Sequence, residues 1–213
     1  MICISIADVT IDEAVNIIED SELSEVRLDR LIFCKDDMAK LFSPENITIA
    51  TYRPTAGVAE SKRKELLIAA INAGAQYVDI EVESGDDFKN DIVETAVSKN
   101  CRVIVSYHNY NKTPFINELE EIIKWCFDSK CHMAKICCHV NSYEECARLL
   151  SLYGYGYPII SIGMGVMGKI TRIASLLLGA PFTYASIADS KKTAPGQIDS
   201  IKLKEILEMI KAL

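Results

Sequence analysis

The sequence predicts an α/β fold in which eight strand-and-helix units close into a (β/α)8 TIM barrel. The first observation is that short β-rich runs alternate with amphipathic helical stretches along the whole chain. The second is that no low-complexity linker divides the 213 residues, so one domain over residues 1–213 is expected. Strands that are separated by helices pair in parallel, and a chain with this many units can close on itself.

The first half of the chain contains four of these units. Each begins with a β-rich run and continues into a stretch with helical spacing, as in Leu66, Leu67, Ala70 and Ile71. Gly74 suits the end of that helix. The strand and helix of each unit are predicted at residues 2–7 with 11–20, 24–31 with 36–42, 46–53 with 60–74, and 76–83 with 87–100.

The second half of the chain repeats the pattern with clearer helix signals. Ser142 and Asp199 suit helix starts, and Gly179 suits a helix end. Trp125 lies on an apolar helix face and is predicted to pack against the barrel. The units are predicted at residues 101–108 with 113–127, 132–140 with 142–154, 157–165 with 168–179, and 182–188 with 199–213.

Composition excludes several classes of partner. The net charge of −7 and the pI of about 5.1 argue against nucleic acid and anionic membranes, because phosphate groups are bound by clustered Lys and Arg. No secretory leader and no run of about 18 apolar residues is visible, so no membrane partner is expected. The protein is therefore expected to be cytoplasmic.

The eight cysteines are predicted to be buried thiols rather than disulfides. Cys3, Cys34, Cys101, Cys126 and Cys146 all fall inside apolar strands and helices. The Cys and His residues between 126 and 139 look like a metal site, but they lack a CxxC pair. Neighbouring residues on a strand also point to opposite faces, so no metal site is predicted.

Polar side chains alternate with apolar ones at the ends of several predicted strands. In SEVRLDR, the charged residues Glu25, Arg27 and Asp29 share one face. If the apolar face meets the helices, these charges point into the barrel mouth, where such barrels hold their active sites. The same period of two pairs Thr51 with Arg53, Asp79 with Glu81, Ser106 with His108, and Met133 with Lys135 and Cys137.

Lys135 is the residue that a structural role explains least, because it interrupts an apolar strand. Desolvation lowers the pKa of a lysine from about 10.4 and gives a neutral amine that attacks carbonyl carbon. We therefore expect a Schiff-base lysine, with His108 as the general base beside it. Together they predict imine-assisted proton abstraction or carbon–carbon cleavage. A purely structural role stays open for the ion pair of Glu25 with Arg27 and for Asp79 with Glu81.

Seven motifs along nearly the whole chain resemble those of the type I 3-dehydroquinate dehydratases, the Schiff-base hydro-lyases of the shikimate pathway. Each motif is short, but all of them occur in the order that the family has. They are EVRLD at 25–29, TYRP at 51–54, VDIE at 78–81, SYHNY at 106–110, AKI at 134–136, MGVMGKITR at 164–172 and TAPGQI at 193–198. The resemblance implies a TIM-barrel lyase that dehydrates 3-dehydroquinate to 3-dehydroshikimate in aromatic amino acid biosynthesis.

The resemblance also implies a role for each residue. Lys135 would form the imine with the C3 ketone of the substrate. His108 would remove the C2 proton and protonate the departing C1 hydroxyl. Arg172 would bind the carboxylate. The remaining assignments are Glu25, Arg27 and Arg53 at the ring hydroxyls, Thr193 and Gln197 in a lid, and Asp79 and Glu81 in support.

Two positions depart from the family pattern. Thr193 stands where the family usually has serine, which keeps the hydroxyl. Gly57 stands four residues after Arg53, where the family commonly has a glutamate that tunes the catalytic histidine. The carboxylate partner of His108 is thus left open between Glu60, Asp79 and Glu81, as is the choice between a biosynthetic and a quinate-degrading role.

Two other functions are kept as alternatives. A class I Schiff-base aldolase or transaldolase would cleave a phosphorylated sugar, and SIGMGVMG at 161–168 could imitate its phosphate loop. A non-catalytic sensor of a shikimate-type ligand is suggested by Gly57. The imine is its own electron sink, so no cofactor or metal is implied. The resemblance suggests a homodimer.

Overall fold

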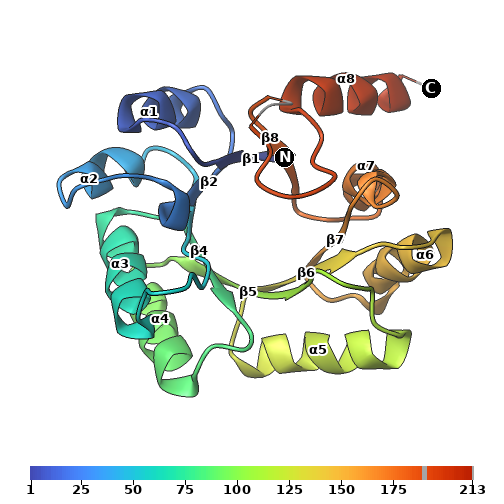
Figure 1. Cartoon of the computed structure of the whole chain (residues 1–213), viewed down its shortest axis with the longest axis horizontal. Helices are drawn as coiled ribbons and strands as arrows, with labels where there is room; N and C mark the ends of the chain where they lie inside the picture. Colours follow the sequence, from blue (N-terminus) through green and yellow to red (C-terminus); the bar gives the residue numbers. More distant parts are fainter. Residues whose placement is uncertain (189–190, 213) are drawn as a thin grey trace.

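The computed structural model describes residues 1–188 and 191–212, and within them the predicted alternation of eight strands and eight helices is confirmed. The strands form a ring with the helices around it (Figure 1). Their bounds are β1 Ile2–Ile6, β2 Ser24–Arg27, β3 Thr48–Thr51, β4 Tyr77–Glu81, β5 Arg102–Asn109, β6 Met133–His139, β7 Ile159–Met164 and β8 Thr183–Ser186.

The helices begin and end where local chemistry favours it. Ser142 caps α6 by accepting a hydrogen bond from the Glu145 amide, and Asp199 caps α8 in the same way. Gly74 ends α3 with a positive φ of 119°. The helices are α1 Ile11–Glu19, α2 Asp37–Leu41, α3 Glu60–Ala73, α4 Asp86–Ser98, α5 Ile116–Asp128, α6 Tyr143–Ser151, α7 Lys169–Leu177 and α8 Ser200–Lys211.

All strands pair in parallel, in the order β7-β6-β5-β4-β3-β2-β1-β8. No backbone ladder joins β7 to β8 in the described chain, so the barrel is open at that one seam. The register between β5 and β6 places Ser106 beside Lys135 and His108 beside Cys137. This register brings the two residues predicted to be catalytic to the same end of adjacent strands.

Apolar side chains fill the barrel interior toward the N-terminal ends of the strands. Ile49, Ile104 and Phe182 are fully buried there, and each contributes roughly 1.5–3 kcal/mol by leaving water. A larger apolar layer lies between the strands and the helices. Charged side chains are left at the C-terminal ends of the strands, as the period-two pattern predicts.

Two packing predictions are wrong. Trp125 is 42% exposed on α5 and does not fill the layer between helix and barrel; the Lys89 ammonium lies 5.8 Å from the centre of its ring. Cys34 is exposed because it precedes the short helix α2 in a loop. Of the other seven cysteines, all free thiols, six are buried as predicted and Cys131 is only partly buried.

No helix in residues 1–188 and 191–212 combines the length and apolar character that crossing a bilayer requires. Over the same residues, no three or more His, Cys, Asp or Glu side chains lie close enough together to hold a metal ion.

Candidate active site

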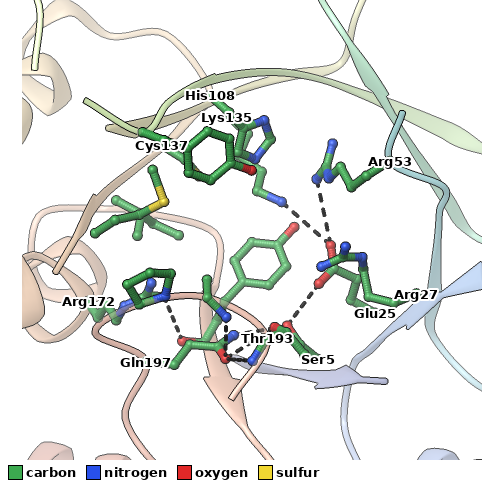
Figure 2. Close-up of a pocket in the computed structure, with 16 residues that line it drawn as sticks. Ser5, Glu25, Arg27, Arg53, His108, Lys135, Cys137, Arg172, Thr193 and Gln197 are labelled. Atoms are coloured by element: carbon green, nitrogen blue, oxygen red, sulfur yellow. Dashed lines mark hydrogen bonds and ion pairs between the residues drawn. The ribbon is translucent and has the colours of Figure 1, made fainter. Parts of the chain in front are cut away.

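A pocket lies at the C-terminal ends of the strands and is closed on one side by the loop before α8 (Figure 2). The strands supply residues that alternate along the chain, so each side chain points inward from its own strand end. Eight of the ten predicted site residues line the pocket: Glu25, Arg27, Arg53, His108, Lys135, Arg172, Thr193 and Gln197. The other two, Asp79 and Glu81, are buried and contact these residues.

Lys135 is 4% exposed and lies among acidic and aromatic groups. Its Nζ is 2.9 Å from Oδ2 of Asp79 and 3.6 Å from Oε1 of Glu25. The ammonium also lies 4.1 Å from the centre of the Tyr184 ring, a cation–π geometry. The inward direction that the sequence predicts for Lys135 is therefore confirmed.

The protonation state predicted for Lys135 is wrong. Burial by itself lowers the pKa of its amine, as expected, but the carboxylates of Asp79 and Glu25 outweigh burial and raise the pKa above the ordinary value. Lys135 therefore rests as an ammonium and has to lose a proton before it attacks a carbonyl. The sequence located the amine but did not reveal that two carboxylates would stand beside it.

Arg53 binds the two carboxylates of β4. Its guanidinium lies 2.5 Å from Oδ2 of Asp79 and 2.6 Å from Oε1 of Glu81, and it also donates to the hydroxyl of Ser106. Arg63 reaches in from α3 and donates to the other oxygen of Glu81 at 2.7 Å. Burial alone would raise the pKa of Asp79, but the cations of Arg53 and Lys135 hold it well below its ordinary value. Asp79 therefore stays ionised.

Glu25 completes the acidic side of the pocket. It accepts hydrogen bonds from the hydroxyls of Ser5 and Thr51 at 2.8 and 3.1 Å. Arg27 lies on the same face and donates twice to Asp29, which the short 3-10 helix Leu28–Arg30 carries past the strand end. The predicted inward direction is thus confirmed for Glu25 and Arg27, whereas Asp29 lies beyond the strand end, does not line the pocket, and is the ion-pair partner of Arg27.

His108 comes from the end of β5 and stacks on Tyr110, with ring centres 6.1 Å apart and planes 14° apart. Figure 2 shows its ring beside the Lys135 side chain. Burial, with the nearby cations of Arg53 and Lys135, lowers the pKa of His108 well below 6.5. The imidazole is therefore neutral near pH 7, which is the form of a general base.

No hydrogen bond to the His108 ring is found within residues 1–188 and 191–212. Glu60 accepts from the amide of Gly85 instead, and Glu81 is held by two arginines. Of the three carboxylates left open by the sequence, only Asp79 acts to raise the pKa of His108, and it does so through space. Gly57 lies in an exposed turn with a φ of 85°.

Arg172 differs from the other cations because no carboxylate pairs with it in the described chain. It is 2% exposed, its Nη1 donates to the Tyr184 carbonyl at 3.3 Å, and its Nε has no hydrogen-bond partner there. Burial lowers the pKa of its guanidinium to about 10. An unpaired buried cation that faces a pocket is suited to bind an anionic group.

The loop before α8 closes over the pocket. Oε1 of Gln197 accepts from the amide and the hydroxyl of Thr193, and Nε2 of Gln197 donates to the hydroxyl of Ser5. Gly196 has a φ of 79°, and a Cβ there would stand 2.2 Å from the carbonyl oxygen of Gly165. Only glycine fits this position, so the loop lies directly against the turn after β7.

Sequence reasoning missed three residues of this site. Ser5 and Tyr184 line the pocket, and Arg63 holds Glu81 from behind. The period-two test would have found Tyr184, since residue 184 points the same way as residue 186 in FTYASIA. Arg63 gave no signal, because a charged residue on a helix is usually exposed.

Comparison with known proteins gives consistent results. A family model described as type I 3-dehydroquinase matches residues 2–213. The 3-dehydroquinate dehydratase of Methanococcus vannielii is 36% identical over 219 residues, which covers 99% of this chain and 100% of the relative. That of Methanocaldococcus jannaschii is 29% identical, with 99% of each chain covered.

Solved structures show the same similarity. The crystal structure of the 3-dehydroquinate dehydratase from Aquifex aeolicus VF5 has a TM-score of 0.83 at 26% identity and covers 98% of both chains. The type I enzyme from Clostridium difficile, solved with covalently modified comenic acid, has a TM-score of 0.87 at 23% identity and covers 100% of this chain and 92% of that one. A 3-hexulose-6-phosphate synthase from Salmonella typhimurium shares the fold alone, at a TM-score of 0.61 and 14% identity.

Proposed function

The chain belongs to the type I 3-dehydroquinase family, and on that premise we propose that its Lys135 and His108 carry the dehydration of 3-dehydroquinate to 3-dehydroshikimate. The reaction is that of a hydro-lyase in the shikimate pathway. The observation that carries the assignment of residues is the buried amine of Lys135 beside the neutral imidazole of His108, at the mouth of the barrel.

Imine formation begins with a proton transfer in this protein. Because Asp79 and Glu25 keep Lys135 protonated, its amine has to give up a proton before it attacks the C3 ketone. His108 is neutral and can take that proton, whereas Asp79 holds its charge too firmly to do so. The amine then adds to C3, and His108 gives its proton to the hydroxyl of the carbinolamine. That hydroxyl leaves as water, which gives the iminium and returns His108 to its neutral form. The two carboxylates that made the amine basic also stabilise this cation.

The elimination uses the same imidazole twice. His108 removes the C2 proton, and the electron pair of that bond enters the iminium to form an enamine. The enamine expels the C1 hydroxyl, which leaves as water with the proton that His108 had taken. Water then hydrolyses the new iminium to the C3 ketone and returns Lys135 as its ammonium. One water is lost overall, and no electrons are gained or lost.

The other predicted residues bind the substrate. Arg172 is proposed to pair with the carboxylate on C1, which would give its guanidinium the partner that the protein does not supply. Thr193 and Gln197 are proposed to close the lid over that end of the substrate. The positions of the other residues in and beside the pocket support their roles. Glu25, Arg27 and Arg53 are proposed to contact the ring hydroxyls, and Asp79 and Glu81 to hold Arg53 in place.

The mechanism as proposed uses residues of one catalytic domain, 1–213, and needs no cofactor, because the iminium is the electron sink. We propose that the protein acts in the cytoplasm as a homodimer. Exposed apolar side chains on the outer helices support a second copy, with Leu177 at 54% and Ile201 at 67% exposure. Light scattering of the purified protein would give the mass of one chain if this proposal is wrong.

Borohydride reduction tests the function directly. The protein is reduced with and without 3-dehydroquinate, and intact and peptide masses are measured. We expect an adduct on Lys135 in the wild type and in His108→Ala, and none in Lys135→Ala. Both variants should lose turnover by a factor of at least about a thousand, because each removes a group that acts in the reaction. Lys62→Ala, which removes an exposed lysine, should behave as the wild type.

Normal dehydration by Lys135→Ala would overturn the assignment. An adduct without product absorbance in the wild type would favour the ligand sensor, and cleavage of a phosphorylated sugar would favour the aldolase.

A further inference from the structure

Tyr184 carries a buried hydroxyl group that has no partner inside the protein. The residue lies on β8 with its side chain inside the barrel, in register with Cys3 of β1, and it is 3% exposed. Its ring packs edge-to-face on Phe182 at 5.5 Å. Yet no hydrogen-bond partner for its Oη occurs within residues 1–188 and 191–212. Native proteins rarely leave a buried hydroxyl unpaired, so this one needs an explanation.

Few other buried polar atoms around the pocket lack a hydrogen-bond partner in the described chain. Ser5, which also lines the pocket, donates to Glu25 and accepts from Gln197, so its hydroxyl is satisfied within the protein. Four buried side-chain atoms in the described chain lack a partner, and two of them belong to residues that line the pocket. These two atoms are Nε of Arg172 and Oη of Tyr184.

Tyr184 also connects the two groups that the proposed function assigns to the ends of the substrate. Its carbonyl oxygen accepts from Arg172, the proposed carboxylate-binding residue. The face of its ring supports the ammonium of Lys135, the proposed imine-forming residue, at 4.1 Å. A substrate that reaches from Arg172 to Lys135 therefore has to lie across Tyr184.

From this juxtaposition we propose that the Tyr184 hydroxyl hydrogen-bonds a secondary ring hydroxyl of the bound substrate and selects for cyclic keto acids that carry it. The inference rests on the proposed function and adds a specificity-determining residue to it. A phenylalanine would fill the same space and support the same ammonium, so the oxygen atom is the part of the side chain that the packing does not explain.

The chemical state of the phenol fits this role. Burial raises the pKa of Tyr184 well above 10, and the carboxylate of Glu25 raises it further. The phenol therefore keeps its proton and can donate to a hydroxyl oxygen or accept from a hydroxyl group. A site that is built to pair with a substrate hydroxyl rejects an analogue that lacks it, because the phenol is then left buried and unpaired.

The test compares the wild type with Tyr184→Phe on 3-dehydroquinate and on its 4-deoxy and 5-deoxy analogues. The variant removes only an unpartnered atom, so we expect its melting temperature to be equal or higher. On 3-dehydroquinate its kcat/KM should fall roughly 10- to 100-fold. On the analogue that lacks the contacted hydroxyl, the wild type and Tyr184→Phe should have the same kcat/KM.

Tyr153→Phe is the matched control. Its hydroxyl is also largely buried, but it accepts from the amide of Ser161 at 2.8 Å and lies outside the pocket. This control should lose stability and keep kcat/KM, the opposite of the result expected for Tyr184→Phe.

Two results would overturn the inference: Tyr184→Phe within twofold of the wild type on 3-dehydroquinate, or an equal loss on all three compounds. The second would mean that the hydroxyl acts through Lys135 rather than on the substrate. Wild-type turnover and the borohydride adduct at Lys135 report separately on the proposed function. If the wild type is active and Tyr184→Phe has the same kcat/KM, the inference about Tyr184 is wrong and the proposed function stands.

Discussion

The two sides of the barrel mouth treat their buried charges differently. On the side built by β2 to β6, cations and carboxylates pair with one another, and Arg53 alone contacts Asp79 and Glu81 within 2.6 Å. On the side built by β7, α7 and β8, Arg172 of α7 and Tyr184 of β8 are both buried, yet each keeps a polar atom without a partner in the described chain. The open seam of the sheet lies on this second side.

The difference separates two tasks of one site. The paired side fixes the protonation states of the reacting groups before any ligand arrives, with a cationic Lys135 and a neutral His108. The unpaired side is incomplete, so a ligand that supplies a carboxylate and a hydroxyl there would gain the interactions that the protein lacks. Recognition of the substrate carboxylate and of one ring hydroxyl is thus expected to depend on α7 and β8, and the chemistry on β5 and β6.

Arg53→Met should have the largest effect on stability. It leaves Asp79 and Glu81 buried without their shared cation, and we expect a loss of about 3–5 kcal/mol in the free energy of unfolding. Urea denaturation at neutral pH measures it. The loss should shrink in acid, because the unpaired carboxylates can then take up protons. A variant as stable as the wild type would show that these ion pairs are not what holds the paired side together.

Arg172→Met should have the opposite profile. It removes a buried cation that has no carboxylate partner in the described chain, so the free energy of unfolding should be unchanged or higher. The KM for 3-dehydroquinate should rise roughly 10- to 100-fold, because a charge-assisted hydrogen bond to the carboxylate is lost. Steady-state kinetics and urea denaturation of the same sample measure both values. A large loss of stability with an unchanged KM would contradict the contrast between the two sides.

The smallest effect is expected in the pH dependence of kcat/KM, in the acid limb where activity falls at low pH. His108 has to be neutral to act as a base, and burial with the neighbouring cations lowers its pKa well below 6.5. Activity should therefore persist as the pH falls through 6.5 and disappear only at lower pH. In Arg53→Met one of those cations is absent, so the pKa of His108 should rise and the acid limb should move to higher pH. If kcat/KM of the wild type fell with a midpoint at or above pH 6.5, the lowered pKa of His108 would be contradicted.

The sequence determined most of the fold and located the two residues that we propose as catalytic. Alternation of β-rich and amphipathic runs predicted the barrel, because parallel strands that are covered by helices leave this pattern. The period of two along each strand predicted that Lys135 and His108 face the same pocket, since alternate side chains share one face. These are local properties, and a sequence records them directly.

Only the tertiary structure decided how the charges are shared. The carboxylates beside Lys135 come from β2 and β4, at positions 25 and 79, and their combined effect reverses the pKa shift that burial alone would cause. The same holds for Arg63, which enters from a helix, and for the unpaired hydroxyl of Tyr184. Electrostatic interactions depend on distances between atoms that are far apart in the chain, so they exist only once the barrel has closed.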